Sequence, residues 1–122
     1  MAKLLLVDDD PHIVSIFQRL LLRVERGFSI RTASSAEQAL LMLAEEPADV
    51  VLTDVRMPGM DGLELLAQIR SLYPQTMIIV MTAYGSEAAV KAQQGGAWAF
   101  LRKPFSAKEL LRIVREALKN AP

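Results

Sequence analysis

One stretch of this chain says most about how it folds: Val50-Val51-Leu52-Thr53-Asp54-Val55-Arg56-Met57-Pro58-Gly59-Met60-Asp61-Gly62. Its apolar start predicts a buried strand over 50–53, and the turn-forming residues after Asp54 predict a loop. Asp54 is therefore expected at the carboxyl end of a strand. Because open α/β sheets bind their ligands at that edge, Asp54 is the first candidate for a functional residue.

On both sides of this stretch, apolar runs alternate with segments in which apolar residues have helical spacing. Five such alternations are typical of an α/β fold with a parallel sheet. Strands are predicted at 4–7, 28–33, 50–53, 77–81 and 97–101. The second strand is more polar and is expected near an edge of the sheet. The continuous apolar run of the fourth is expected at the centre, where both faces are covered.

A side chain that can cap a helix follows each predicted strand. These caps are Asp10, Ser34, Asp61, Ser86 and Ser106, and three of them form capping boxes with a glutamate three residues later: Ser34 with Glu37, Asp61 with Glu64, and Ser106 with Glu109. The first helix begins with Pro11 and is expected to stop at Gly27. The fourth is expected to be the weakest, because it is short, consists mainly of alanines and ends at Gly95-Gly96.

Composition excludes several classes of function. With 122 residues, one domain over 1–122 is expected, and 14 basic residues balance 14 acidic ones. Zero net charge does not favour direct contact with nucleic acid or a membrane surface. The absence of cysteine excludes disulfides and thiolate zinc sites. The apolar start ends at Asp8, too early for a secretion signal, and no run approaches the roughly 20 apolar residues that span a bilayer. We expect a soluble, cytoplasmic domain.

Polar side chains follow four of the predicted strands: Asp8 and Asp9 after the first, Asp54 after the third, Thr82 after the fourth and Lys103 after the fifth. Parallel strands end at the same edge, so these groups can converge on one crevice. Three crowded carboxylates repel one another unless a cation lies among them, and Mg²⁺ suits a site made only of oxygen ligands. The bound cation would let a phosphate donor approach, with a carboxylate as nucleophile. The hydroxyl of Thr82 and the ammonium of Lys103 could then bind the phosphoryl oxygens.

These motifs resemble the receiver domains of two-component response regulators. The resemblance covers the whole chain and rests on Asp8-Asp9, on Asp54 with the segment Arg56-Met57-Pro58-Gly59-Met60-Asp61-Gly62, on Thr82-Ala83 and on Lys103-Pro104-Phe105. The wording of the motifs is most similar to receivers of nitrogen-regulation-type transcriptional activators. The resemblance implies a flavodoxin-like (βα)5 three-layer sandwich with a five-stranded parallel sheet of order 2-1-3-4-5.

The resemblance also implies roles for the residues at this edge. Asp54 would accept a phosphoryl group from the phosphohistidine of a sensor histidine kinase. Mg²⁺ would be held by the side chains of Asp9 and Asp54 and by the backbone carbonyl of Arg56, with Asp8 acting mostly through water. The chain would then be no enzyme beyond its own phosphorylation and dephosphorylation.

Three further positions match the family. Thr82 and Lys103 would hold the phosphoryl group, and Thr82 with Phe100 would form a switch that responds to it. The switch would act on the surface formed by the fourth helix, the fifth strand and the last helix, and this surface is also a candidate for homodimer formation. The Lys103-Pro104 bond is cis in the family. The output would be control of an effector domain or partner protein, with transcription regulation expected.

Other functions fit the same residues less well. A haloacid-dehalogenase-type phosphatase carries Asp-x-Asp followed by Thr or Val after its first strand, a pattern that Asp8-Asp9-Asp10-Pro11 breaks. A flavin-binding module needs a neutral or hydroxyl-rich phosphate cradle there, and three aspartates have the wrong charge. A stand-alone receiver that acts by protein–protein contact stays open. Taken singly, Thr82 is a turn residue, Lys103 a surface charge, Phe100 a core residue and His12 an exposed residue of a first helical turn.

Overall fold

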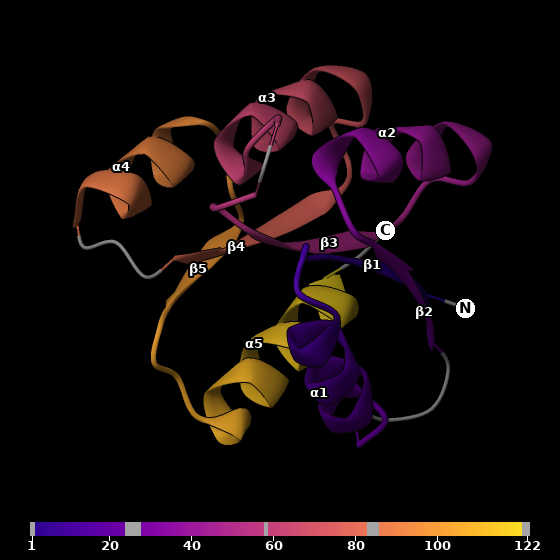
Figure 1. Cartoon of the computed structure of the whole chain (residues 1–122), viewed down its shortest axis with the longest axis vertical. Helices are drawn as coiled ribbons and strands as arrows, with labels where there is room; N and C mark the ends of the chain where they lie inside the picture. The colour runs from indigo at the N-terminus through magenta and orange to yellow at the C-terminus, as the bar shows by residue number, and fades with distance from the viewer. Residues whose placement is uncertain (1, 24–27, 58, 83–85, 121–122) are drawn as a thin grey trace.

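The sheet and helices alternate along the chain as the sequence pattern predicts (Figure 1). The computed structural model describes residues 2–23, 28–57, 59–82 and 86–120, without the side chains of 86–89. Within these ranges the elements are β1 (Ala2–Val7), α1 (Pro11–Leu21), β2 (Phe28–Ala33), α2 (Ala36–Glu45), β3 (Val50–Asp54), α3 (Gly62–Leu72), β4 (Met77–Thr82), α4 (Ser86–Gln94), β5 (Ala99–Arg102) and α5 (Ala107–Asn120).

All neighbouring strands are parallel, in the order β2-β1-β3-β4-β5. Figure 1 shows α2, α3 and α4 on one face of the sheet and α1 and α5 on the other. The predicted flavodoxin-like three-layer fold and strand order are therefore confirmed. The prediction of β2 at an edge and of β4 in the interior is confirmed as well.

Alternation along the strands divides the core into two clusters. Leu5, Val51 and Ile78 are buried with α2, α3 and α4, whereas their neighbours Leu4 and Val50 are buried with α1 and α5. Both faces of the central strands are apolar, which is why these strands appear in the sequence as continuous apolar runs. The two clusters fix the sheet between its layers and leave its carboxyl edge open to polar residues.

Three of the predicted helix caps are confirmed. The side chain of Asp10 accepts a hydrogen bond from the His12 amide (2.9 Å), and Asp61 accepts one from the Glu64 amide (2.8 Å). At the start of α5, the Ser106 side chain accepts from the Glu109 amide, and the Glu109 carboxylate accepts from the Ser106 amide, which forms the predicted capping box. The cap predicted from the Ser86 side chain lies outside the described residues.

The predicted capping box of Ser34 with Glu37 is wrong by one residue. Ser35 caps α2 by accepting from the Gln38 amide (3.0 Å), and Gln38 Oε1 accepts from the Ser34 amide (2.6 Å). This register lets α2 bury three of its small and apolar side chains against the sheet: Ala36, Ala39 and Leu43. It also leaves Glu37 exposed and available for another contact.

Two element ends differ from the prediction. α1 ends at Leu21, where the Leu22 amide bonds back to Gln18, and residues 24–27 lie outside the described ranges. β5 begins at Ala99 rather than at residue 97, because the Ala97 amide still bonds to the carbonyl of Ala92 at the end of α4. α4 does end before Gly95-Gly96, as predicted. Among the described residues, no helix has the length and apolar character needed to cross a bilayer.

Candidate phosphoacceptor site

The strand ends bring the predicted polar residues to one edge of the sheet. Asp54 is the last residue of β3 and pairs with Met81, and Thr82 ends β4 and pairs with Arg102 of β5. Lys103 follows directly, and its amide donates to the carbonyl of Thr82 (2.8 Å). The parallel register thus places the end of β4 and the residue after β5 beside Asp54.

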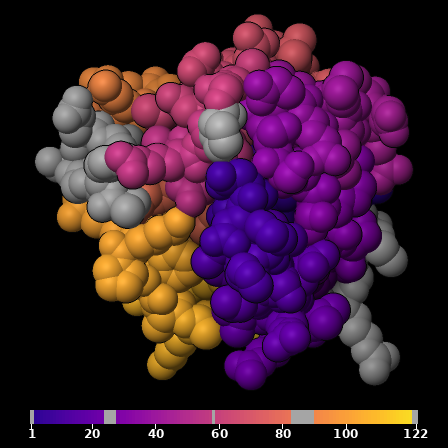
Figure 2. Space-filling view, in the orientation of Figure 1, coloured from indigo at the N-terminus to yellow at the C-terminus, as the bar shows by residue number. Residues whose placement is uncertain are grey.

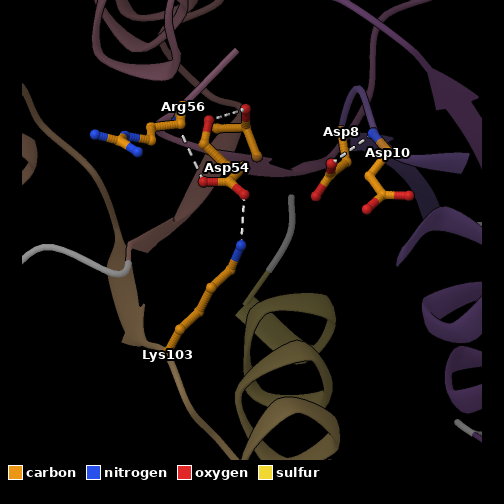
Figure 3. A network of polar contacts seen from close by, with 6 residues as sticks. Asp8, Asp10, Asp54, Arg56 and Lys103 are labelled. Carbon is orange, nitrogen blue, oxygen red and sulfur yellow. Dashed lines mark hydrogen bonds and ion pairs between the residues drawn. The ribbon is translucent and has the colours of Figure 1, made fainter. Parts of the chain in front are cut away.

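Both carboxylate oxygens of Asp54 have partners (Figure 3). Oδ2 accepts from Lys103 Nζ at 2.5 Å, and Oδ1 accepts from the backbone amide of Arg56 at 3.2 Å. The side chain of Asp54 is 13% exposed and that of Lys103 31%, so the pair is partly shielded yet reachable from solvent. In Figure 3 the guanidinium of Arg56 points away from Asp54. Arg56 therefore faces Asp54 with its backbone.

The segment after Lys103 is anchored below the sheet. The Lys103-Pro104 peptide bond is cis, as the resemblance implied. Two residues later the ring of Phe105 packs on Phe17 of α1, with centroids 5.9 Å apart. This contact lies on the face of the sheet that α1 and α5 cover, while the hydrogen bond from Lys103 to the Thr82 carbonyl keeps the Lys103 backbone at the end of β4.

Asp8 is buried at the same edge, directly after β1, with only 2% of its surface exposed. Its Oδ1 accepts from the amide of Asp10 at 3.0 Å, whereas Oδ2 is buried and has no partner among the described residues. Burial is the main cause that raises the pKa of Asp8, and the negative charges of Asp54 and Asp9 raise it further. The amide of Asp10 and the ammonium of Lys103 lower this pKa in part. The figure shows Asp8 across the site from Asp54 (Figure 3).

The oxygen donors at this edge suit Mg²⁺ better than they suit a closed metal cage. Within the described ranges, no three His, Cys, Asp or Glu side chains are arranged as a metal cage. Mg²⁺ requires less than this, because one or two carboxylates with retained water usually bind it. The buried, unpartnered Oδ2 of Asp8 beside the carboxylate of Asp54 fits such a cation. Asp9 is exposed at the next position, and its role and that of the Arg56 carbonyl as ligands stay predictions.

The two predicted switch residues differ in environment. Thr82 is buried, with 1% of its surface exposed, whereas Phe100 on β5 is 37% exposed. The reading of Phe100 as a core residue is therefore wrong for this structure, and its role as a switch stays a prediction. His12 is exposed in the first turn of α1, as predicted.

Sequence reasoning missed Gly62, which lies directly behind Asp54. Its amide donates to the carbonyl of Val55 (2.8 Å), and a Cβ atom at this position would lie 2.1 Å from the carbonyl oxygen of Asp54. Only a residue without a side chain allows α3 to begin so close to β3. A signal was present in the sequence, since a glycine directly after a helix cap is a poor helix former and calls for a packing reason.

Comparison with known proteins agrees with this geometry. A family model described as the response regulator receiver domain matches residues 4–115. The response regulator protein FleR of Pseudomonas aeruginosa is 45% identical over 123 residues, which cover 99% of this chain and 26% of FleR. The DNA-binding transcriptional regulator NtrC of Salmonella typhimurium is 41% identical over 115 residues, covering 93% of this chain and 24% of NtrC. This chain thus spans about a quarter of the length of these relatives.

Solved structures give the same result. The receiver domain of NtrX from Brucella abortus superposes with a TM-score of 0.87 at 31% identity, covering 97% of this chain and 99% of that domain. A CheY-like receiver domain protein from Methanospirillum hungatei has a TM-score of 0.88 at 30% identity, covering 98% of this chain and 94% of that one. The chain therefore belongs to the response regulator receiver domains of two-component systems, and its similarity to receivers of nitrogen-regulation-type activators is confirmed.

Proposed function

We propose that this receiver accepts a phosphoryl group on Asp54 from the phosphohistidine of a sensor histidine kinase. The observation that carries the proposal is the Asp54 carboxylate at the sheet edge, partly exposed and oriented by Lys103 and the Arg56 amide. An Asp54 oxygen attacks the phosphorus, the P–O bond forms as the P–N bond breaks, and the electron pair leaves with the imidazole nitrogen. The chain carries out no catalysis beyond its own phosphorylation and dephosphorylation.

Mg²⁺ is the cofactor that we propose for this site. Asp8, Asp9 and Asp54 would hold it together with the backbone carbonyl of Arg56, directly or through water. Three carboxylates and one ammonium group, that of Lys103, lie close enough to interact electrostatically. The negative charges outnumber the positive one, so the edge carries excess negative charge. When bound, Mg²⁺ supplies positive charge for the carboxylates and for the oxygens of the phosphoryl group.

The chain's own residues orient and neutralise the phosphoryl group. Lys103 Nζ donates to Asp54 Oδ2 before reaction and can turn to a phosphoryl oxygen when this carboxylate oxygen has formed its new bond. The Arg56 amide holds the other carboxylate oxygen in place, so that only one oxygen is presented to the donor. The hydroxyl of Thr82, one residue beyond the partner of Asp54 in the sheet, donates to the phosphoryl group.

The output follows from the surface next to this site. We propose that phosphorylation, through Thr82 and Phe100, changes the surface of α4, β5 and α5. This surface would control an effector domain or a partner protein in the cytoplasm and could pair two copies of the chain. Transcription regulation is the expected output, because relatives that match over this region have names of transcriptional regulators and are about four times as long. A stand-alone receiver that acts by protein–protein contact is the alternative.

Replacement of Asp54 tests the proposal. Wild-type protein, incubated with Mg²⁺ and radiolabelled acetyl phosphate, should acquire an acid-labile label, and Asp54→Asn should acquire none. Asp10→Asn is the matched control, since Asp10 is an exposed aspartate that caps α1 and asparagine caps equally well. The control should keep the wild-type label. Label that persists on Asp8 or Asp9 of the Asp54→Asn variant would contradict the assignment, and steady turnover of p-nitrophenyl phosphate would favour a phosphatase instead.

A further inference from the structure

The loop between Asp54 and α3 is held at its base and near its tip. At the base, the Gly62 amide donates to the Val55 carbonyl (2.8 Å). Near the tip, the amide of Met60 donates to Oε2 of Glu37 at 3.3 Å. Glu37 is 23 positions away in the sequence and belongs to the first turn of α2. A neighbouring helix therefore holds the loop that follows the proposed phosphoacceptor.

Glu37 Oε2 also lies close to Gly59, the residue before Met60. Gly59 has a left-handed backbone with φ of 77°, and a Cβ atom there would lie 2.7 Å from Glu37 Oε2. The backbone conformation therefore favours glycine, and a Cβ atom here would displace the Glu37 carboxylate from its present position. The hydrogen bond to Met60 and the short distance to Gly59 together place the Glu37 carboxylate over the peptide that joins these two residues.

Both sides of this contact are next to residues packed in the core. α2 packs on the sheet through Ala36, Ala39 and Leu43, and the loop side chain of Met57, 8% exposed, is buried in the same cluster. Figure 1 shows α2 beside α3 on one face of the sheet, and in Figure 2 the purple surface of α2 meets the pink surface that includes α3. A hydrogen bond between two fixed elements loses little entropy when it forms and can hold a loop in one position.

We infer that Glu37 is a positioning residue for the phosphoacceptor site: it holds the loop so that the Arg56 backbone is aligned with Asp54. Arg56 lies between the two anchored points of the loop, and its amide bonds to Asp54 Oδ1 while its carbonyl is the proposed Mg²⁺ ligand. Release of the tip would let both groups move. The inference deepens the proposed function and rests on it for the consequence at the metal site, but the contact itself does not depend on that function.

Variants of Glu37 separate its hydrogen bond from its charge. Glu37→Ala removes the acceptor, whereas Glu37→Gln keeps an oxygen that can accept from Met60 without the negative charge. Glu45→Ala and Glu45→Gln are the matched controls, since Glu45 is an exposed glutamate at the other end of α2. The first readout is hydrogen exchange of the Met60 amide, which should become about three- to tenfold faster in Glu37→Ala, as expected for the loss of one net hydrogen bond.

The second readout is the Mg²⁺ concentration at half-saturation, followed by the amide resonances of Asp9 and Arg56. Glu37→Ala should raise this Mg²⁺ concentration about threefold, while the resonance positions at saturating Mg²⁺ stay unchanged. Glu37→Gln should need a Mg²⁺ concentration close to that of wild type. Thermal unfolding at high Mg²⁺ should match that of Glu45→Ala, so that a general loss of structure is not mistaken for misplacement of the loop.

The outcomes decide between the two proposals. If Met60 exchange and Mg²⁺ half-saturation in Glu37→Ala equal those of Glu45→Ala, the inference is overturned. If wild-type protein acquires no label from acetyl phosphate, the proposed function is contradicted, and the exchange of the Met60 amide still decides whether Glu37 holds the loop.

Discussion

Asp8 and Asp54 lie at the same edge of the sheet, yet their charges are compensated in different ways. Asp54 has a partner on each carboxylate oxygen, including the ammonium of Lys103. Asp8 is almost fully buried and has a partner on one oxygen only among the described residues. A buried, half-satisfied carboxylate destabilises the fold when it is ionised, because no solvent replaces the missing hydrogen bonds. Selection for stability alone would not keep an aspartate here.

The first prediction concerns Asp8→Asn. At neutral pH without divalent cations, the free energy of unfolding of this variant should be about 1–3 kcal/mol higher than that of wild type, because asparagine removes a buried negative charge. The pKa of Asp8 is raised in the folded state, so the folded chain binds the proton more tightly, and wild-type stability falls as pH rises from the ordinary pKa of aspartate through the raised one. Asparagine does not titrate, so the difference should vanish in acid.

Urea denaturation at several pH values measures this difference. The control is Asp9→Asn, which changes an exposed neighbour and should alter stability by less than about 0.5 kcal/mol. An Asp8→Asn variant that is less stable than wild type at pH 7 would contradict the argument.

The second prediction concerns the cation. If Mg²⁺ binds beside Asp8, wild type should gain about 1.4 kcal/mol of unfolding free energy at a concentration ten times the dissociation constant. Asp8→Asn should gain less, since one negative charge is gone. Melting temperatures measured at increasing MgCl₂ in Ca²⁺-free buffer give the gains of wild type and variant, with NaCl at equal ionic strength as the control. Equal gains in wild type and variant would show that Asp8 does not contribute to binding.

At the scale of elements, β3, its loop and α3 depend on a close approach at Gly62. The third prediction is that Gly62→Ala loses about 1–3 kcal/mol of unfolding free energy, as overpacked sites do, because its Cβ would meet the backbone of Asp54 and Val55. The backbone cannot move aside without shifting Asp54, so phosphoryl labelling should also slow. Chemical denaturation and labelling with acetyl phosphate measure these effects.

Gly95→Ala is the control for this prediction. A Cβ at Gly95 would lie 2.9 Å from Leu66 Cδ2 and 3.3 Å from the Lys91 carbonyl oxygen, so this site is also crowded but lies away from the backbone of Asp54. The control should therefore lose some stability through overpacking and leave labelling at the wild-type rate. Equal effects of the two substitutions on labelling would show that the contact with Asp54 is not the cause.

The elements themselves could be predicted to the extent that local signals determine them. β2 has the predicted bounds, and Asp10, Asp61 and Ser106 cap the predicted helices. The start of α2 was wrong because Ser34 with Glu37 and Ser35 with Gln38 fit the same capping pattern, and only burial of the α2 face against the sheet distinguishes them. Local patterns carry no such tertiary information.

The position of the site residues could be predicted from the order of strands and loops alone. Parallel strands bring their carboxyl ends together whatever the loops do, so the residues Asp54, Thr82 and Lys103 could be assigned to one edge. Glu37 could not, because its contact joins an exposed helix side chain to a distant loop amide and leaves no periodic or compositional trace. Residues at strand ends are readable from a sequence, and residues that hold loops from neighbouring elements require the structure.

At the scale of the whole molecule, the ion pair of Asp54 with Lys103 joins the centre of the sheet to its edge strand. Lys103 follows β5, which lies at the opposite edge from β2. Three large apolar side chains are exposed here: Val90 on α4, Phe100 on β5, and Trp98 in the segment that joins them. A change in the partner of Lys103 therefore acts first on β5, beside which these apolar side chains are exposed.

The last prediction follows from this connection. Addition of beryllofluoride with Mg²⁺, which mimics an aspartyl phosphate, should make Lys103 turn from Asp54 to the new group and shift β5 with it. The amide resonances of residues 90–102 should change, while those of β2 (28–33), three strands away from β4, should change little. Trp98 is the only tryptophan, so its fluorescence reports the same event without labelling. Asp54→Asn with the same additions is the control and should show neither change. If wild type binds the mimic, as seen at the Asp54 resonances, and residues 90–102 stay unchanged, then the ion pair does not transmit phosphorylation to β5, and the proposed switch of this surface is wrong.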